Sequence, residues 1–442
     1  MADYLQFADP FWENPPSDTA PKNAFQHWDN IAMAPISSMP MGTAELSIVG
    51  QGTIAVNSKT TDGIEFCVST GTSYPKLILK LTQHSATFYK KEDAAKETLL
   101  EGTDLRPESS RFIPSTSPKD GTVYWLSIDR SNWVLRYGKY YTSKWLTLVE
   151  VKLDDKKGEW LEQLTTVKVD DSKKPTRVMG VRVDPNIKIS RLPVTLDLPP
   201  IVVSNEAVTL RRLDFLAETS WVNLPNACQN LYHNISGEKI SLDAEPEFQQ
   251  LAEAIHKSVT TPGLWGHNKL KSKCKNPTNP DPKEFVYKYL RITIGSNKGN
   301  SPGIPYVMEV WPPGHKSPIH DHGDACAVIR VLSGTIQCTW YDTLVENVDP
   351  IMLGQPVALK KDQITWLGEN QYQIHALENK NDETCITLQC YEYPKDNDVH
   401  EEKFRFIETS TKAKDRFTPN SDSTFTEFYQ LMKDEWHANK SG

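Results

Sequence analysis

The stretch 306–342, YVMEVWPPGHKSPIHDHGDACAVIRVLSGTIQCTWYD, constrains the fold of this 442-residue chain more than any other segment. Its apolar and β-branched runs, separated by Pro and Gly, predict short strands joined by tight turns. Side chains alternate between the two faces of a strand, so His320 and His322 should point the same way. Two imidazoles placed in this manner can bind one metal ion from a single strand.

Glycines around this pair, and a third histidine downstream, resemble the cupin signature. The first half of that signature matches the spacing of Gly314, His320, His322 and Gly334. The second half brings one more histidine from a distant strand, and His375 fits that place. The resemblance implies a small double-sheet jelly roll with a metal ion held in its mouth. The ligands would be three histidines, without a carboxylate.

Further motifs resemble the cysteine dioxygenase (type I) family, the thiol dioxygenase branch of the cupins, over roughly residues 205–400. The family run W-x-x-G-H-x-x-x-I-H-x-H stands at residues 311–322. A Tyr-x-Arg motif stands upstream at Tyr289 and Arg291, and a His-x-x-Glu-Asn motif stands at residues 375–379. The following strand, CITLQCYEYP, carries Tyr391 at the place of the family's active-site tyrosine. Each motif alone is weak, but their order and spacing are specific.

The resemblance implies an iron-dependent enzyme that adds both atoms of O2 to the sulfur of L-cysteine, giving cysteine sulfinate. Fe(II) would be held by His320, His322 and His375, and a thiol bound to the metal should ionise. Arg291 would bind the substrate carboxylate with two parallel hydrogen bonds, a geometry that lysine does not reproduce. Tyr391 would be the catalytic residue that contacts substrate and oxygen. Tyr289 and Gln389 would complete the substrate site.

Two residues depart from the family pattern. Gln389 stands where a histidine is common, and glutamine cannot shuttle a proton, although it can hold the phenol of Tyr391 by a hydrogen bond. Ala327 stands where animal members carry a cysteine joined to the active-site tyrosine, and cupins in general often carry a glutamate ligand there. The neighbouring Cys326 would face away on a regular strand, so we expect no such crosslink.

These departures leave alternatives open. The substrate could be another small thiol, such as 3-mercaptopropionate. The domain could also be a non-catalytic cupin that binds metal structurally or binds a small ligand. A zinc or manganese cupin with isomerase or hydrolase activity is a third alternative, because imidazole ligands alone do not select iron.

The predicted fold class is mainly β, with four segments. Residues 1–44 form an irregular Pro-rich arm, and residues 45–183 form an antiparallel β-sandwich whose hairpin 124–141 turns at Asp129–Asn132. Residues 184–204 hold four prolines and are expected to form an extended linker. Residues 205–442 form the cupin domain with flanking helices. Those helices are predicted at 245–257, capped by Asp243, and at 424–437, capped by Ser423.

Composition and charge exclude several classes of protein. The net charge of −8 argues against a nucleic-acid partner, and the mean hydropathy of −0.52 argues against a membrane protein. The seven cysteines are odd in number and lack Cys-x-x-Cys spacing, which favours a reducing compartment. Because the first residues lack a secretory signal pattern, we expect a cytoplasmic location. The N-terminal β domain could bind a ligand or associate with itself.

Overall fold

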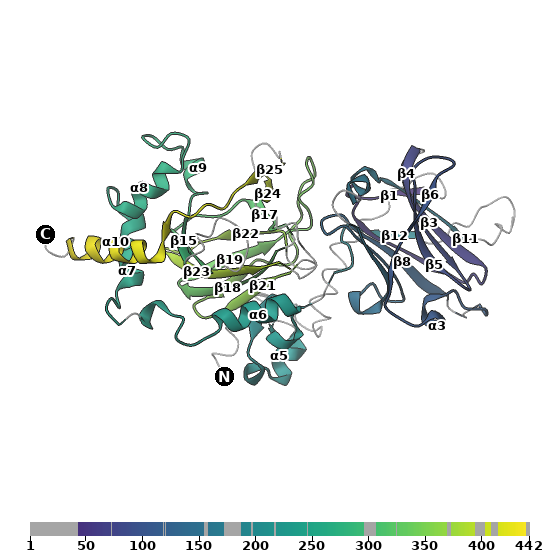
Figure 1. Ribbon diagram of the computed structural model, residues 1–442, viewed down its shortest axis with the longest axis horizontal. Coiled ribbons are helices and arrows are strands. Elements are labelled where there is room, and N and C mark those ends of the chain that lie inside the picture. Colours follow the sequence, from purple (N-terminus) through teal and green to yellow (C-terminus); the bar gives the residue numbers. More distant parts are fainter. Residues whose placement is uncertain are drawn as a thin grey trace, which may run out of the picture. The chain divides into compact units, whose positions relative to one another are not determined.

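The computed structural model describes residues 43–438, apart from 72, 118, 120, 154–157, 172–186, 196–197, 216–217, 245, 296–305, 324, 369–372, 394–402 and 408–413. The described residues fall into two compact units, with the boundary between Asp197 and Leu198 (Figure 1). All but the last two residues of the predicted Pro-rich arm, 1–44, lie outside the described residues. Among the described residues, no helix combines the length and apolar character needed to cross a bilayer.

The N-terminal unit is the predicted antiparallel β-sandwich. One six-stranded sheet has the order β1 (Thr43–Glu45), β11 (Thr166–Asp171), β3 (Gly63–Thr70), β4 (Ser73–Thr82), β5 (Ala86–Lys91) and β6 (Glu97–Leu100). The other has the order β12 (Ile187–Ser190), β2 (Gly52–Ser58), β8 (Thr122–Asp129), β9 (Val134–Lys139), β10 (Thr147–Lys152) and β7 (Thr103–Asp104). Short helical turns complete the unit at α3 (Glu108–Arg111), η1 (Lys144–Leu146) and η2 (Glu159–Gln163).

Alternate residues of the two sheets point inward and form one apolar core, which includes Phe66, Leu79, Leu126 and Tyr137. The predicted hairpin is β8–β9, and the side chain of Asp129 accepts hydrogen bonds from the backbone and side chain of Asn132 at its turn. These Asx contacts replace backbone pairing where the chain reverses.

The Pro-rich stretch 184–204 does not run as a free linker along its described length. Its first part forms β12, which pairs with β2 of the sandwich. Its last part forms β13 (Ile201–Val203), which pairs with β21 (Ile364–Leu367) of the C-terminal unit. Pro193, Pro199 and Pro200 stand between these strands, where no ladder hydrogen bond requires their missing N–H.

The C-terminal unit contains two β-sheets. The eight-stranded sheet has the order β14 (Glu218–Ser220), β13, β21, β18 (Cys326–Ser333), β23 (Cys385–Glu392), β16 (Tyr306–Trp311), β15 (Leu290–Ile294) and β26 (Ser423–Thr424). The six-stranded sheet has the order β20 (Val357–Lys360), β19 (Thr335–Trp340), β22 (His375–Glu378), β17 (Ile319–His320), β24 (Phe404–Ile407) and β25 (Lys414–Phe417). This arrangement is the jelly roll expected for a cupin, and it confirms the mainly β fold class.

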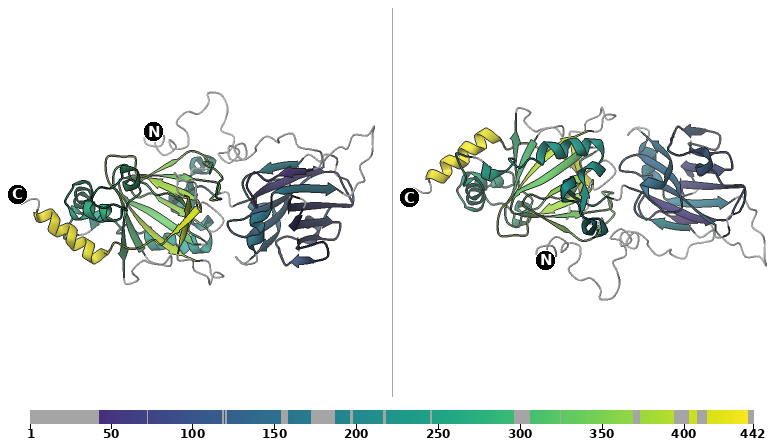
Figure 2. Two further views of the ribbon diagram at one scale, coloured as in Figure 1. Left: turned by 90° about the horizontal axis from the view of Figure 1, so that it is seen from above. Right: turned by 90° about the horizontal axis from the view of Figure 1, so that it is seen from below.

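Helices cover parts of the C-terminal unit. They are α5 (Leu210–Phe215), α6 (Asn226–Ile235), α7 (Leu251–Thr260), α8 (Trp265–Ser272), α9 (Pro282–Phe285) and α10 (Phe425–Ala438), with short turns η3 (Asn205–Ala207), η4 (Trp221–Asn223) and η5 (Leu242–Ala244). Helix α6 packs on β18 and β23. The C-terminal α10, yellow in Figures 1 and 2, lies against α7 near β15.

Both predicted helix caps are wrong. The helix expected over 245–257 begins later, at Leu251, and the carboxylate of Asp243 pairs with Lys361 instead of capping it. Phe248 is buried against Tyr429 of α10, so tertiary packing holds this segment outside the helix. At the second helix the cap is Thr424, which exchanges backbone–side-chain hydrogen bonds with Glu427, three residues on.

Candidate metal centre and substrate pocket

Three buried histidines meet at one place on the six-stranded sheet of the C-terminal unit. His320 ends β17 and lies directly opposite His375, the first residue of β22, while His322 follows two residues later. The ring centroids of His320 and His322 lie 4.8 Å apart, and His375 lies 4.9 Å from each of them. Their ligand atoms lie within 4.8 Å of one another, so the three rings could hold one metal ion.

Burial keeps these imidazoles in the form that binds a metal. Desolvation lowers the pKa of His320, and it lowers the pKa values of His322 and His375 well below 6.5. Nδ1 of His320 lies 3.0 Å from the carbonyl oxygen of Pro318, so Nδ1 carries the proton and Nε2 keeps its lone pair. Among the described residues, Nδ1 of His322 has no hydrogen-bond partner although it is buried. Neutral rings with free lone pairs fit a divalent transition metal.

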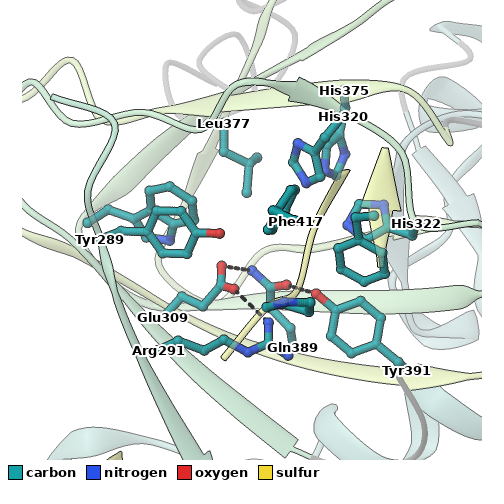
Figure 3. Close-up of a pocket in the computed structure, with 13 residues that line it drawn as sticks. Tyr289, Arg291, Glu309, His320, His322, His375, Leu377, Gln389, Tyr391 and Phe417 are labelled. Carbon is teal, nitrogen blue, oxygen red and sulfur yellow. Dashed lines mark hydrogen bonds and ion pairs between the residues drawn. The ribbon is translucent and has the colours of Figure 1, made fainter. Parts of the chain in front are cut away.

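The eight-stranded sheet supplies the opposite wall of the pocket (Figure 3). Arg291 of β15 and Glu309 of β16 are direct cross-strand partners, and Nη1 of Arg291 lies 3.4 Å from Oε1 of Glu309. Gln389 of β23 donates a hydrogen bond to the other carboxylate oxygen of Glu309, and the hydroxyl of Tyr391 donates to Oε1 of Gln389. Four side chains from three neighbouring strands therefore form one continuous polar chain across the pocket.

Charge and burial shift the pKa values of two ionisable groups in this polar chain. Glu309 is only 4% exposed, and desolvation raises its pKa from 4.5 to about 7, although nearby Arg291 opposes the rise. Desolvation, followed by the charge of Glu309, raises the pKa of Tyr391 above its ordinary value of 10. Tyr391 is therefore a neutral hydroxyl at physiological pH, whereas Glu309 titrates near it.

Arg291 keeps its best anion-binding face free. It is 2% exposed, and among the described residues its Nε and Nη2 have no hydrogen-bond partner. These two nitrogens form the side of the guanidinium that receives a carboxylate through two parallel hydrogen bonds. Buried donors of this kind are costly to leave unpaired, so the site is built for an acceptor.

Aromatic side chains close the remainder of the pocket. Tyr289 stacks on Trp311 with ring centroids 4.1 Å apart, and the indole of Trp311 donates to Oγ1 of Thr387. Phe404 of β24 meets the ring of His322 edge-on at 4.6 Å, and Phe417 of β25 lies 5.9 Å from His320. These rings surround the histidines with apolar surface and limit the access of water.

The structure brings every predicted site residue to this pocket: Tyr289, Arg291, His320, His322, His375, Gln389 and Tyr391. His315, in the turn between β16 and β17, does not line the pocket, and its Nδ1 lies 2.5 Å from the carbonyl oxygen of Lys288. Ala327 lies directly opposite Tyr391, and Cys326 is paired with Glu392, one position along. The register therefore directs Cys326 to the other face of the sheet from Tyr391.

Sequence reasoning missed five lining residues, namely Glu309, Leu377, Phe404, Phe417 and Pro419. Glu309 stands two residues before Trp311, so strand alternation alone would have placed it on the pocket face. Phe404 and Phe417 belong to β24 and β25, which follow the last recognisable motif and carry no pattern of their own. Their approach to the histidines depends on β24 pairing with β17.

The fold and the histidine triad define a cupin with a candidate metal centre. Residues 286–401 match the family model described as cysteine dioxygenase type I, which confirms the predicted resemblance over the C-terminal region. Two similar curated proteins, from Rattus norvegicus and Mus musculus, are both named cysteine dioxygenase type 1. Each is 24% identical over 111 residues, covering 25% of this chain and 54% of the relative. The chain thus spans about half the length of the curated relatives it matches.

Among solved structures, one match is the Cupin_2 domain of an XRE-family transcriptional regulator from Enterobacter cloacae. It is 16% identical, with a TM-score of 0.19, and the match covers 24% of this chain and 98% of that domain. The family model and the curated relatives make this part of the C-terminal unit similar to the thiol dioxygenase branch of the cupins.

Proposed function

We propose that this protein is an Fe(II)-dependent thiol dioxygenase that converts a small carboxylate-bearing thiol, with L-cysteine as the first choice, to its sulfinic acid. One observation carries the proposal: a buried triad of neutral histidines faces, across one small pocket, an arginine whose bidentate face is free. A thiol at one end of a short molecule and a carboxylate at the other would match these two features.

His320, His322 and His375 would hold the iron, which would supply the redox chemistry by placing the substrate sulfur next to O2. The protein groups then provide geometry. Nε and Nη2 of Arg291 would fix the carboxylate, and so orient the sulfur toward the histidines. This positioning acts before any bond changes, so its loss should raise KM strongly.

Tyr391 would serve as a hydrogen-bond acceptor beside the reacting atoms, because its hydroxyl proton is donated to Gln389. Its ring stacks near that of His322 at a centroid distance of 5.8 Å. Oε1 of Gln389 accepts a hydrogen bond from the phenol, and because an amide does not take up the proton, Tyr391 is held in place without being deprotonated. Phe404 and Phe417 would exclude water from the oxidised sulfur.

The alternative substrate 3-mercaptopropionate carries the same thiol and carboxylate but lacks an amine. Because the polar chain Arg291–Glu309–Gln389–Tyr391 addresses the carboxylate end, it is compatible with either compound. A panel of thiols separates the two substrates.

The test is anaerobic reconstitution with Fe(II), followed by O2 uptake and sulfinate analysis with L-cysteine, 3-mercaptopropionate and 2-mercaptoethanol. We expect stoichiometric iron and a strong preference for the carboxylate thiols. Full iron loading with no O2 uptake for any thiol would refute the dioxygenase proposal and leave a metal-binding cupin. Uptake with 3-mercaptopropionate but not cysteine would select the alternative substrate.

Variants assign the roles. His375→Ala should abolish iron binding, as measured by metal analysis, and retained stoichiometric iron would contradict the ligand set. Arg291→Ala should keep iron but raise KM for carboxylate thiols at least tenfold, as expected for a lost charge-assisted bidentate contact. 2-Mercaptoethanol, which lacks a carboxylate, should show no comparable change. Glu346→Gln, on an exposed turn of the same unit, serves as a control.

A further inference from the structure

A buried carboxylate stands beside the proposed substrate-binding arginine. Glu309 lies on the neighbouring strand, directly opposite Arg291, with one oxygen toward Nη1 and the other receiving a hydrogen bond from Gln389. Both residues line the pocket and both are nearly inaccessible to solvent. The arginine therefore already has a counterion before any substrate arrives.

We infer that Glu309 is a specificity-determining residue that ties binding of a substrate carboxylate at Arg291 to uptake of one proton by its own carboxyl group. The inference rests on the proposed function and deepens it. An ionised Glu309 and a substrate carboxylate would flank a single guanidinium, one at Nη1 and one at Nε and Nη2. This would bury one net negative charge, which desolvation and like-charge repulsion both oppose.

Protonation of Glu309 removes the conflict. The solvent supplies the proton, Glu309 becomes a neutral acid, and the guanidinium is left with the substrate carboxylate as its one counterion. The neutral acid still accepts the hydrogen bond from Gln389, so the polar chain to Tyr391 is preserved. The pKa of Glu309, about 7 without a second anion, makes this protonation accessible at physiological pH.

Other charged or titratable groups surround Glu309. Those acting on it from the packed elements are Arg291 of β15, Tyr289 just before β15, Tyr391 of β23 and Lys273 at the end of α8, and the three histidines face it across the pocket. The tyrosines remain neutral because burial raises their pKa values, and Lys273 is already engaged with Asp422 at 2.7 Å. Among these groups on its own wall of the pocket, Glu309 is the one that titrates near pH 7.

The test counts protons directly. Fe(II)-loaded protein is titrated anaerobically with 3-mercaptopropionate by calorimetry, in two buffers of different ionisation enthalpy, for the wild type and for Glu309→Gln. Ionisation of the substrate thiol releases the same proton in both proteins, so the difference isolates Glu309. We expect the wild type to take up about 0.9 proton more than the variant at pH 8 and about 0.1 more at pH 6, from a free pKa near 7.

Steady-state kinetics should agree. The KM of the wild type for 3-mercaptopropionate, divided by the KM of Glu309→Gln, should rise about tenfold per pH unit above 7. The same ratio for 2-mercaptoethanol should not change with pH. A proton difference near zero at both pH values would overturn the inference. That result is distinct from failure of the dioxygenase proposal, because the calorimetry requires no turnover.

A second comparison needs no variant, in case Glu309→Gln does not fold. In the wild type at pH 8, binding of 3-mercaptopropionate should be accompanied by about one more proton taken up than binding of uncharged 2-mercaptoethanol. Equal proton counts for the two thiols would overturn the inference. Glu346→Gln controls for a glutamate-to-glutamine change outside the pocket.

Discussion

Replacing Glu309 by Gln should make the protein's stability less sensitive to pH. Glutamine has the shape of a protonated glutamate, so the substitution fixes residue 309 in its neutral form. In the folded wild type the pKa of Glu309 is raised from 4.5 to about 7. Between these two pH values the unfolded chain ionises the carboxyl while the folded protein keeps it protonated, so stability falls as pH rises.

The size of this effect follows from the pKa change. A rise from 4.5 to about 7 corresponds to a loss of about 3 kcal/mol, absent below pH 4.5 and complete above pH 7. The carboxyl is 4% exposed, so solvent screening does not reduce the effect greatly. In a unit of this size, about 3 kcal/mol corresponds to a shift of roughly 6–12 °C in Tm.

Differential scanning calorimetry of the full chain provides the assay, with metal removed from both proteins. At pH 5 the wild type and Glu309→Gln should unfold at similar temperatures. At pH 8 the variant should unfold at a higher temperature than the wild type, within the range given above. An equal Tm difference at both pH values would refute the reasoning, because it would mean that Glu309 titrates alike in the folded and unfolded states.

Two further substitutions test the packing of each unit. Asn379→Ala should destabilise the C-terminal unit by about 2–4 kcal/mol in denaturant unfolding. The buried side-chain amide of Asn379 donates to the carbonyl oxygens of Trp311 at 2.8 Å and Glu383 at 2.7 Å, and both hydrogen bonds would be lost. A loss of stability no larger than that of Asn276→Ala, on an exposed loop, would contradict this role. Arg136→Met should destabilise the N-terminal sandwich by about 3–5 kcal/mol, because a fully buried guanidinium paired with Glu150 is lost. Iron content should be unchanged in the second variant, and its loss would show that the two units do not behave independently.

The sequence allowed the histidine triad to be predicted because a local rule orients two of its members and a family motif supplies the third. Strand alternation orients His320 and His322 together, and the distant His375 follows from the family spacing. Cross-strand pairing of His320 with His375 supplies the remaining geometry. The same alternation carries Tyr289 with Arg291 and Gln389 with Tyr391 to the pocket wall.

Features that depend on pairing between distant segments could not be predicted from the sequence. The partnership of Glu309 with Arg291 requires the register between β15 and β16, which the positions of the two motifs in the sequence do not fix. The late start of α7 reflects burial of Phe248 against α10, a contact between segments about 180 residues apart in the sequence. In both cases a tertiary contact decides the local structure, and single-sequence patterns do not record such contacts.

The pocket divides its tasks between two sheets. The six-stranded sheet carries the three histidines, and the eight-stranded sheet carries the arginine, glutamate, glutamine and tyrosine. In the proposed enzyme, substitutions along β15, β16 and β23 would therefore alter the residues around the substrate and leave the three candidate metal ligands unchanged. The metal and the carboxylate end of the substrate would thus be contacted by different sheets of the proposed enzyme.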